Sequence, residues 1–281
     1  MGQPGHLAGL ILKTNPKPFL TAEWRHLAML NFPIDRAVLE PRVPAGTTLD
    51  TYQGQAYVSV VGFLFLKTKL LGVPVPFHQD FEELNLRFYV RRLAGDEWRR
   101  GVVFIQEIVP KAAIAAVARL AYNENYVALP MRHRLTPPAA PAPDTVSYEW
   151  EFQHRWHGLH LRTTGDPRWP RPGSLDEFIT EHYWGYARQK DGGCVEYRVE
   201  HPPWRVWRAA EASLDADVAA LYGEAFAPAL RAAPSSAFLA EGSPVTVFHG
   251  QRICIAQSMH QEMGGPSTGG RRARKTRFTR L

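Results

Sequence analysis

Cysteine is scarce in this chain of 281 residues, which contains only Cys194 and Cys254. The two form no CxxC pair and no disulfide framework, so we expect the reducing environment of the cytoplasm. The apolar run near the N-terminus, HLAGLILK, is shorter than the roughly 20 residues that a membrane-spanning helix needs, and it lacks an evident signal-peptide cleavage site. We therefore expect no membrane span.

Common catalytic signatures are missing as well. The sequence contains no GxSxG nucleophile motif, no glycine loop that could cradle a phosphate and no dinucleotide-binding fingerprint. His154, His157 and His160 suggest a metal site at first sight, but in a strand His157 would oppose the other two, and no nearby carboxylate or cysteine completes a ligand set. We therefore predict neither a metal ion nor an organic cofactor.

The net charge of +6 comes from the C-terminal end. Residues 271–281 carry six basic side chains and no acidic one, and the rest of the chain has 27 basic residues against 27 acidic residues. A formally neutral body is not the electrostatic footprint of a nucleic-acid groove. We expect no specific nucleic-acid partner.

The body of the chain has the composition of a folded protein. Hydrophobic residues make up 45% of the sequence, which is enough to bury a sizeable core. The segment from about Gln257 onward is rich in glycine, serine and arginine, and it has too little apolar content to offset the entropy of ordering. We predict an N-terminal extension over residues 1–19, a single domain over 20–255 and a disordered basic tail over 256–281.

Alternating apolar and polar residues predict strands along much of the chain. In ELNLRFYVRR the leucines and Phe88 occupy one face, and Glu83, Asn85 and Arg87 occupy the other. VSYEWEFQHRW, residues 146–156, also alternates and is predicted as one strand. The prolines of EHPPW, residues 200–204, are expected to break a strand rather than to take part in chemistry.

The predicted helices are few and short. The apolar spacing is helical over residues 112–122, after Pro110. A capping box from Ser174 to Glu177 opens a helix over residues 174–187, and Ser213 is the predicted N-cap of another over 213–223. Many antiparallel strands with a few short helices indicate an α+β protein built around a sheet or barrel.

Several segments, in this order, resemble one family. They are FPIDRAVLEPRVPAGTTLDTYQGQAYVSVVGF, FEELNLRFYVR, GVVFIQEIVPKAAIAAVARLAYNENYVALPMRH and EYRVEHPPW, and the resemblance extends over about residues 20–255. The chain resembles the YqjF-type family, a domain of unknown function, which in turn is similar to the acetoacetate decarboxylase superfamily. The resemblance implies a mostly antiparallel β-barrel with a pocket inside it.

The pair Pro110–Lys111 raises the question of a Schiff-base lysine. In acetoacetate decarboxylases the reactive lysine comes after a small-residue helix, and the resemblance puts its place near residues 123–126, where this chain has no lysine. Lys111 comes before the helix, and a helix N-terminus alone contributes only about 0.3–1 kcal/mol, too little to keep a lysine neutral. We predict that Lys111 is a solvated lysine and that any chemistry proceeds without a Schiff base.

The polar face of residues 83–87 is the first candidate site. The resemblance puts Glu83 at the place of the decarboxylase's pocket glutamate, where it would act as a general acid or base. Asn85 and Arg87 share its face and would orient a ligand, since a guanidinium can bind a carboxylate through two contacts. The alternative is that this face is exposed to solvent or forms a structural ion pair.

A second set of candidates follows the predicted helix. By position, Asn123, Glu124, Asn125, Tyr126 and Arg132 should approach the pocket and bind a ligand. Asparagine is equally well suited to a turn that ends a helix, so a structural role is the alternative.

Two functions stay open on this evidence. In the first, the barrel binds a small anionic or carbonyl-bearing molecule and acts on it, if at all, without a lysine. In the second, it is a non-catalytic protein that binds an apolar ligand or pairs with a protein partner, such as a second copy of itself.

Overall fold

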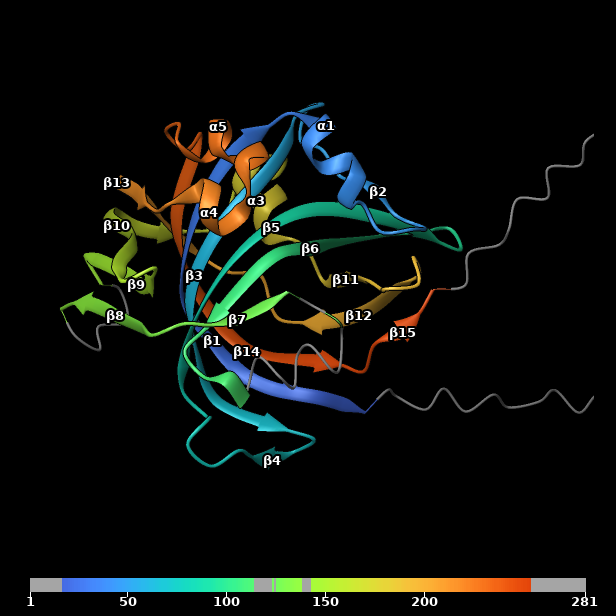
Figure 1. Ribbon diagram of the computed structural model, residues 1–281, viewed down its shortest axis with the longest axis horizontal. Helices are drawn as coiled ribbons and strands as arrows, with labels where there is room; N and C mark the ends of the chain where they lie inside the picture. Colours follow the sequence, from blue (N-terminus) through green and yellow to red (C-terminus); the bar gives the residue numbers. More distant parts are fainter. Residues whose placement is uncertain (1–16, 114–122, 124, 138–142, 254–281) are drawn as a thin grey trace, which may run out of the picture.

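Strands dominate the computed structural model, which describes residues 17–113, 123, 125–137 and 143–253. The strands are β1 (Pro18–Ile34), β2 (Thr48–Leu49), β3 (Ala56–Leu70), β4 (Val73–Pro74), β5 (Phe81–Ala94), β6 (Glu97–Val109), β7 (Tyr126–Ala128), β8 (Met131–Thr136), β9 (Thr145–Phe152), β10 (Arg155–Arg168), β11 (Trp184–Arg188), β12 (Cys194–Glu200), β13 (Val206–Asp215), β14 (Ser236–Phe248) and β15 (Gln251–Arg252). The helices are α1 (Arg36–Leu39), η1 (Glu40–Arg42), α3 (Leu175–Thr180), α4 (Val218–Tyr222), η2 (Glu224–Phe226) and α5 (Ala227–Leu230). In Figure 1 the helices gather at one end of the strands.

Seven strands close into a ring. The order of pairing is β14, β1, β3, β5, β6, β11 and β12, and β12 pairs again with β14. Every pair in this ring is antiparallel except β6 with β11. The predicted fold class, an α+β protein with a mostly antiparallel barrel or sheet, is confirmed.

The neighbouring strands of the ring are paired over very different lengths. β1 pairs with β3 along nearly its whole length, from Leu20 to Ile34. The hairpin of β11 and β12 is joined to the ring by only two residue pairs on each side, with β6 and with β14. This hairpin is therefore the least firmly paired part of the barrel wall.

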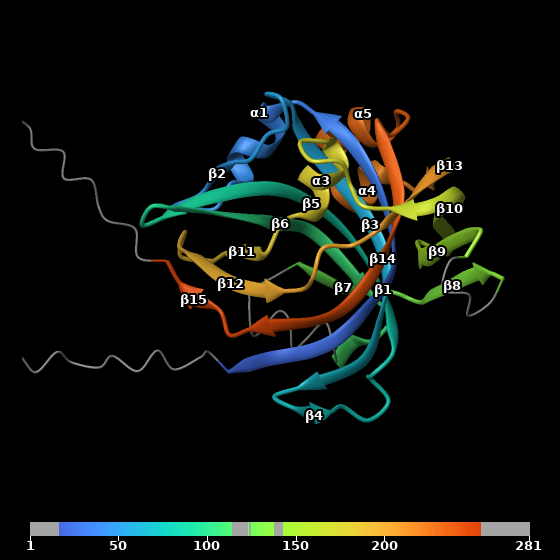
Figure 2. The same cartoon turned by 180° about the vertical axis from the view of Figure 1, so that it is seen from behind.

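A second group of strands leaves the ring at β14. The pairing continues from β14 through β13, β10 and β9 to β8. Figure 2 shows β8, β9 and β10 on the side of the molecule opposite to β11, β12 and β15.

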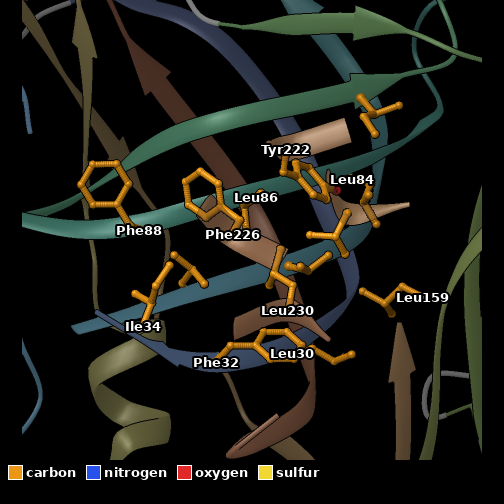
Figure 3. Packing of buried hydrophobic residues seen from close by; sticks show 14 of the residues in the cluster. Leu30, Phe32, Ile34, Leu84, Leu86, Phe88, Leu159, Tyr222, Phe226 and Leu230 are labelled. Atoms are coloured by element: carbon orange, nitrogen blue, oxygen red, sulfur yellow. The ribbon is translucent and has the colours of Figure 1, made fainter. Parts of the chain in front are cut away.

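Both faces of β5 are buried, so the strand separates two hydrophobic clusters. Leu86 and Phe88 belong to the larger cluster, which joins β1, β3 and β5 to β9, β10, α4 and α5. Figure 3 shows Phe88, Leu86 and Phe226 side by side in this cluster. Tyr89 and Phe81, on the opposite face, belong to the second cluster inside the barrel. A one-residue slip of β5 would exchange the two faces, so its register is strongly specified.

One predicted strand and one predicted helix have the wrong boundaries. Residues 146–156 do not form one strand, because the chain reverses at Gln153 and His154, which have φ of 51° and 61°, between β9 and β10. The helix predicted to run to residue 187 ends at Thr180, because residues 184–188 pair with β6 and β12 as strand β11. Apolar spacing records neither the tight turn between β9 and β10 nor the pairing of β11 with the distant β6.

Of the two predicted helix N-caps, one is confirmed and one is wrong. Ser174 is the N-cap of α3 and accepts a hydrogen bond from the Glu177 backbone N–H at 3.3 Å, as predicted. Ser213 is not a cap, because it lies within β13. Asp217 caps α4 instead and accepts from the Ala220 N–H at 3.2 Å.

The helix predicted over residues 112–122 lies mostly outside the described residues, as do the predicted tail and most of the predicted N-terminal extension. None of the helices in the described part of the chain is long and apolar enough to cross a membrane.

Candidate functional site

The barrel encloses a cavity of about 140 Å³. An engineered protein cavity of roughly 150 Å³ holds a benzene-sized molecule, so this one has room for a small organic ligand. Most of its lining residues are aliphatic or aromatic. The charged and other polar side chains that line it, apart from two tyrosines, are Glu83, Asn85, Arg87, Glu107, Thr180, His182 and His201.

Strand β5 carries the first three candidate residues into this cavity. Glu83 and Asn85 are 3% and 2% exposed, and Arg87 is half-buried. They alternate with Leu84 and Leu86, which are fully buried on the other face. The alternation therefore predicted correctly which side chains share a face, and the alternative of a solvent-exposed face is wrong.

A hydrogen-bonded polar cluster extends from Glu83 across three strands. The Asn85 amide Nδ2 donates to Glu83 Oε1 at 3.2 Å, and the Tyr126 hydroxyl donates to Glu83 Oε2 at 3.3 Å. Glu107 of β6 is the cross-strand neighbour of both Asn85 on β5 and Tyr126 on β7, and it is 1% exposed. The cavity wall thus holds two buried carboxyl groups beside an amide and a phenol.

Among the described residues that line the cavity, Arg87 carries the guanidinium group. Its Nη2 lies 3.9 Å from the Met29 sulfur, and its guanidinium carbon lies 5.7 Å from the centre of the Tyr89 ring. Within the described residues, no carboxylate lies within ion-pair distance of Arg87, and its buried Nε has no hydrogen-bond partner. A buried charge is costly unless it is paired, so this guanidinium is equipped to receive an anion.

His182 lines the cavity just after α3, and its ring packs beside those of Tyr89 and Phe178. Burial lowers its pKa to about 4, the Asp50 carboxylate acts in the opposite direction, and the positive charge of Arg100 lowers the pKa further. Asp50 Oδ2 lies 3.5 Å from His182 Nε2 and 2.7 Å from Arg100 Nε. The imidazole is therefore neutral near pH 7.

His201 belongs to an aromatic part of the wall. Its ring stacks on Trp204 with centroids 4.1 Å apart, and Nδ1 lies 2.9 Å from the Pro202 carbonyl oxygen. Burial lowers the pKa of His201, and the positive charge of Arg87 acts in the same direction. His201 and Trp204 line the same cavity as Arg87.

The candidates that follow the predicted helix are mostly elsewhere. Tyr126 lines the cavity, but Asn123 and Asn125 line a separate cleft on the outside of β6, where they donate to the carbonyls of Arg188 and Ile105. Arg132 pairs with Glu149 and lies over the Trp156 ring at 4.0 Å, away from the cavity. Of the described candidates in this segment, only Tyr126 lines the cavity. Asn123, Asn125 and Arg132 do not. Glu124 lies outside the described residues.

Lys111 is not part of the cavity wall. Its ammonium group donates to the backbone carbonyl of Phe77, and no lysine is among the described residues that line the cavity. In the same part of the chain, no group of three or more His, Cys, Asp or Glu side chains is arranged to hold a metal ion.

Sequence reasoning missed Glu107, His182 and His201 as cavity residues. For Glu107 a signal was available, because it is a lone carboxylate in the apolar strand GVVFIQEIV. His182 fell in a segment predicted as helix, and His201 in a segment interpreted only as a strand break. Their place depends on how α3 and the loop after β12 fold back over the barrel, which no local pattern records.

Comparisons with known proteins agree with this architecture. The chain is 27% identical over 194 residues to the uncharacterized protein YqjF of Bacillus subtilis (strain 168), a match that covers 68% of this chain and 77% of YqjF. The structure of acetoacetate decarboxylase from Legionella pneumophila has a TM-score of 0.60 at 12% identity, covering 89% of this chain and 92% of that one. The enduracididine biosynthesis enzyme MppR, complexed with pyruvate, has a TM-score of 0.58 at 12% identity, covering 87% of this chain and 93% of that one.

These structural likenesses concern the fold alone at such low identities. The sequence match is more specific, because the model of the DUF2071 family, described as an uncharacterized conserved protein, matches residues 21–244. That range includes all or most of every strand of the ring and nearly all of the cavity wall. The chain therefore belongs to the DUF2071 family and has the fold of acetoacetate decarboxylase-like proteins.

Proposed function

We propose that the cavity binds a small carboxylate that also bears a carbonyl group, and that the protein transfers a proton on this ligand without forming a Schiff base. The observation that carries the proposal is Arg87, a half-buried guanidinium with no carboxylate partner among the described residues. A ligand carboxylate would supply the missing anion through a two-point contact.

Glu83 is the proposed general acid or base. It lies two residues from Asn85 and four from Arg87 on the same face of β5, so a ligand held by Arg87 can extend toward its carboxyl group. Asn85 would donate a hydrogen bond to the ligand carbonyl, and Tyr126 orients the Glu83 carboxyl through its hydroxyl. A carboxyl group placed in this way can remove a proton from the carbon next to the carbonyl and return it, which needs no other reactant.

The similarity to MppR supports a keto acid as the ligand class. That protein, which has the same fold, was solved in complex with pyruvate. Because no lysine lines the described cavity here, the keto group would stay free rather than form an imine.

Binding and exchange can be tested separately with pyruvate. Isothermal titration should show binding to the wild-type protein and its loss in Arg87→Gln. In deuterium oxide, NMR should show faster exchange of the pyruvate methyl protons with the wild type than with Glu83→Gln, by about 100-fold or more if Glu83 is the base. Glu149→Gln, on the outer strand β9, is the matched control and should change neither the binding of pyruvate nor the exchange of its methyl protons.

Borohydride distinguishes this proposal from classical decarboxylation. Reduction in the presence of pyruvate should leave every lysine unmodified in peptide mass spectrometry. A stable adduct on Lys111 would contradict the lysine-independent mechanism.

The second candidate function is the binding of an apolar ligand without chemistry. The mostly aliphatic and aromatic lining of the cavity favours it. If the second candidate is correct, Arg87→Gln will leave the affinity for an apolar probe unchanged and no carboxylate will bind more tightly than its uncharged analogue.

A further inference from the structure

We infer that the ligand of this cavity carries an aromatic ring at the end opposite to its carboxylate. The inference rests on the proposed function for the place of the carboxylate at Arg87 and adds the substrate class: aryl-substituted keto acids rather than short aliphatic ones.

Strand β5 contributes to the cavity wall over much of its length. Phe81, Glu83, Asn85 and Arg87 all line it, so Phe81 and Arg87 mark its two ends on this strand. Their Cα atoms are six strand residues apart, about 20 Å at the usual rise of a strand. Even with the reach of the arginine side chain, a keto acid of three carbons cannot contact both ends.

Phe81, at the end away from Arg87, belongs to a group of aromatic rings in the wall, here called the aromatic cluster: Trp24, Phe63, Phe65, Phe81 and Trp204. Trp24 meets Phe63 and Phe65 edge-to-face, with centroids 5.5 and 5.8 Å apart. Phe65 stacks on Phe81 with centroids 4.7 Å apart and planes inclined by 10°.

The cluster comes from four separate parts of the chain that meet only in the closed barrel. Trp24 lies on β1, Phe65 on β3, Phe81 on β5, and Trp204 in the loop after β12. The Trp204 indole N–H donates to the Ser243 hydroxyl at 2.9 Å, which satisfies its polar group in the wall. Apart from the buried Trp24 Nε1, which has no hydrogen-bond partner among the described residues, the cluster consists of ring edges and faces.

Such a surface prefers a ring to an alkyl chain. Aromatic rings attract one another in edge-to-face and offset-stacked arrangements beyond the area that they bury, because the ring edge is positive and the ring face negative. The carboxyl, amide and guanidinium groups of the wall and the Tyr126 phenol come from β5, β6 and β7, and His201, stacked on Trp204, lies where this polar part meets the aromatic cluster. A ligand that matches both parts has a carboxylate and a carbonyl at one end and an aryl group at the other.

Four matched compounds test the inference by isothermal titration: phenylpyruvate, pyruvate, cyclohexylpyruvate and phenylacetone. Phenylpyruvate should bind at least about tenfold more tightly than pyruvate, because it buries a ring. It should bind roughly two- to tenfold more tightly than cyclohexylpyruvate, because only the planar ring has a quadrupole. Phenylacetone lacks the carboxylate and should bind weakly.

The outcomes separate the inference from the proposed function. Equal affinities of phenylpyruvate and pyruvate, or of phenylpyruvate and cyclohexylpyruvate, would overturn the aromatic ligand class while leaving the role of Arg87 intact. Equal affinities of phenylpyruvate and phenylacetone would overturn the carboxylate site and leave the aromatic end intact. If phenylpyruvate does not bind at all, both are wrong.

Two phenylalanines on one strand supply the matched variants. Phe81→Leu removes a ring from the aromatic cluster. It should lower the affinity for phenylpyruvate about fivefold or more and leave the affinity for pyruvate unchanged. Phe88→Leu removes a ring from the opposite face of β5, where Phe88 is fully buried in the other cluster, and should change neither affinity. Circular dichroism checks that both variants fold, and the four-compound comparison on the wild type does not depend on either of them.

Discussion

At the scale of single residues, the cavity wall holds ionisable side chains in an environment that is otherwise aromatic and aliphatic. Glu83, Glu107 and His182 are all less than 9% exposed. Burial of an ionisable group is costly, so it persists where a partner or a ligand compensates. For His182, whose pKa is lowered by burial, this cost links the stability of the fold to the protonation state of the side chain.

The pH dependence of stability should report His182. Burial lowers its pKa from 6.5 to about 4, so between these values the unfolded chain binds more protons than the folded protein. The free energy of unfolding should therefore fall as the pH drops from about 6.5 to about 4, by about 3 kcal/mol from this group. Urea denaturation at a series of pH values measures the slope.

His182→Gln should flatten that slope, because it removes the group that takes up the proton. His160→Gln, exposed on β10, is the control and should keep the wild-type slope. For Asp50, burial alone would raise the pKa, but the hydrogen bonds from His182 and Arg100 lower it below 3.8, so its contribution is lost only at more acidic pH. An identical slope in His182→Gln and the wild type would show that the buried imidazole does not govern this range.

Gly62 on β3 should be intolerant of a side chain. A Cβ atom there would lie 2.5 Å from Cδ2 of the fully buried Tyr148 ring, which is held by its hydroxyl donating to the His26 carbonyl at 2.8 Å. We expect Gly62→Ala to lower the free energy of unfolding by about 1–3 kcal/mol. In a Tyr148→Leu background the cost should shrink, and strict additivity of the two changes would contradict a direct clash.

At the scale of elements, the sequence pattern predicted type better than extent. β5 follows from alternation, and the start of α3 follows from a capping box. The reversal at residues 153–154 and the strand β11 do not, since the first is a tight turn at two residues with positive φ and the second is decided by pairing with β6, far away in the sequence. The candidate site divides in the same way: Glu83, Asn85 and Arg87 follow from the period of one strand, whereas His182 and His201 reach the cavity only through tertiary structure.

The caps of α4 provide a test at this scale. Asp217→Ala removes the side chain that accepts from the Ala220 N–H and should cost about 1 kcal/mol of unfolding free energy. Ser213→Ala should cost less than about 0.5 kcal/mol, because Ser213 lies exposed in β13 rather than at a helix start. Chemical denaturation of both variants measures the difference, and the reverse order would contradict the assigned cap.

At the scale of the whole molecule, closure of the ring creates the cavity. Strand alternation and the resemblance together predicted a barrel, but neither showed that β12 would meet β14 or where the ring would be weakest. Closure costs chain entropy because the strands that meet are distant in sequence, and the energy that offsets it comes from two clusters at once. The two clusters share β5, which explains why both of its faces are buried.

Amide hydrogen exchange should differ between the strands of the ring that are paired over short and over long stretches. The amides of β12 that pair with β14 should exchange faster than those of β1 that pair with β3, because two residue pairs hold the first seam and a nearly complete ladder holds the second. Native-state exchange by NMR or mass spectrometry measures both. Equal protection of the two seams would contradict the difference inferred from pairing.

The hairpin of β11 and β12 contributes Trp184, Gly185, Tyr197 and Val199 to the cavity wall while it is joined to the ring by few pairs. The hairpin is therefore the part of the wall whose sequence can vary most easily in evolution. Substitutions or length changes in it can reshape the cavity without disturbing the register of β5, on which Glu83, Asn85 and Arg87 depend. Among relatives that share this polar strand, divergence in ligand preference should therefore concentrate in the hairpin, and grafting the hairpin of one relative onto another should transfer that preference.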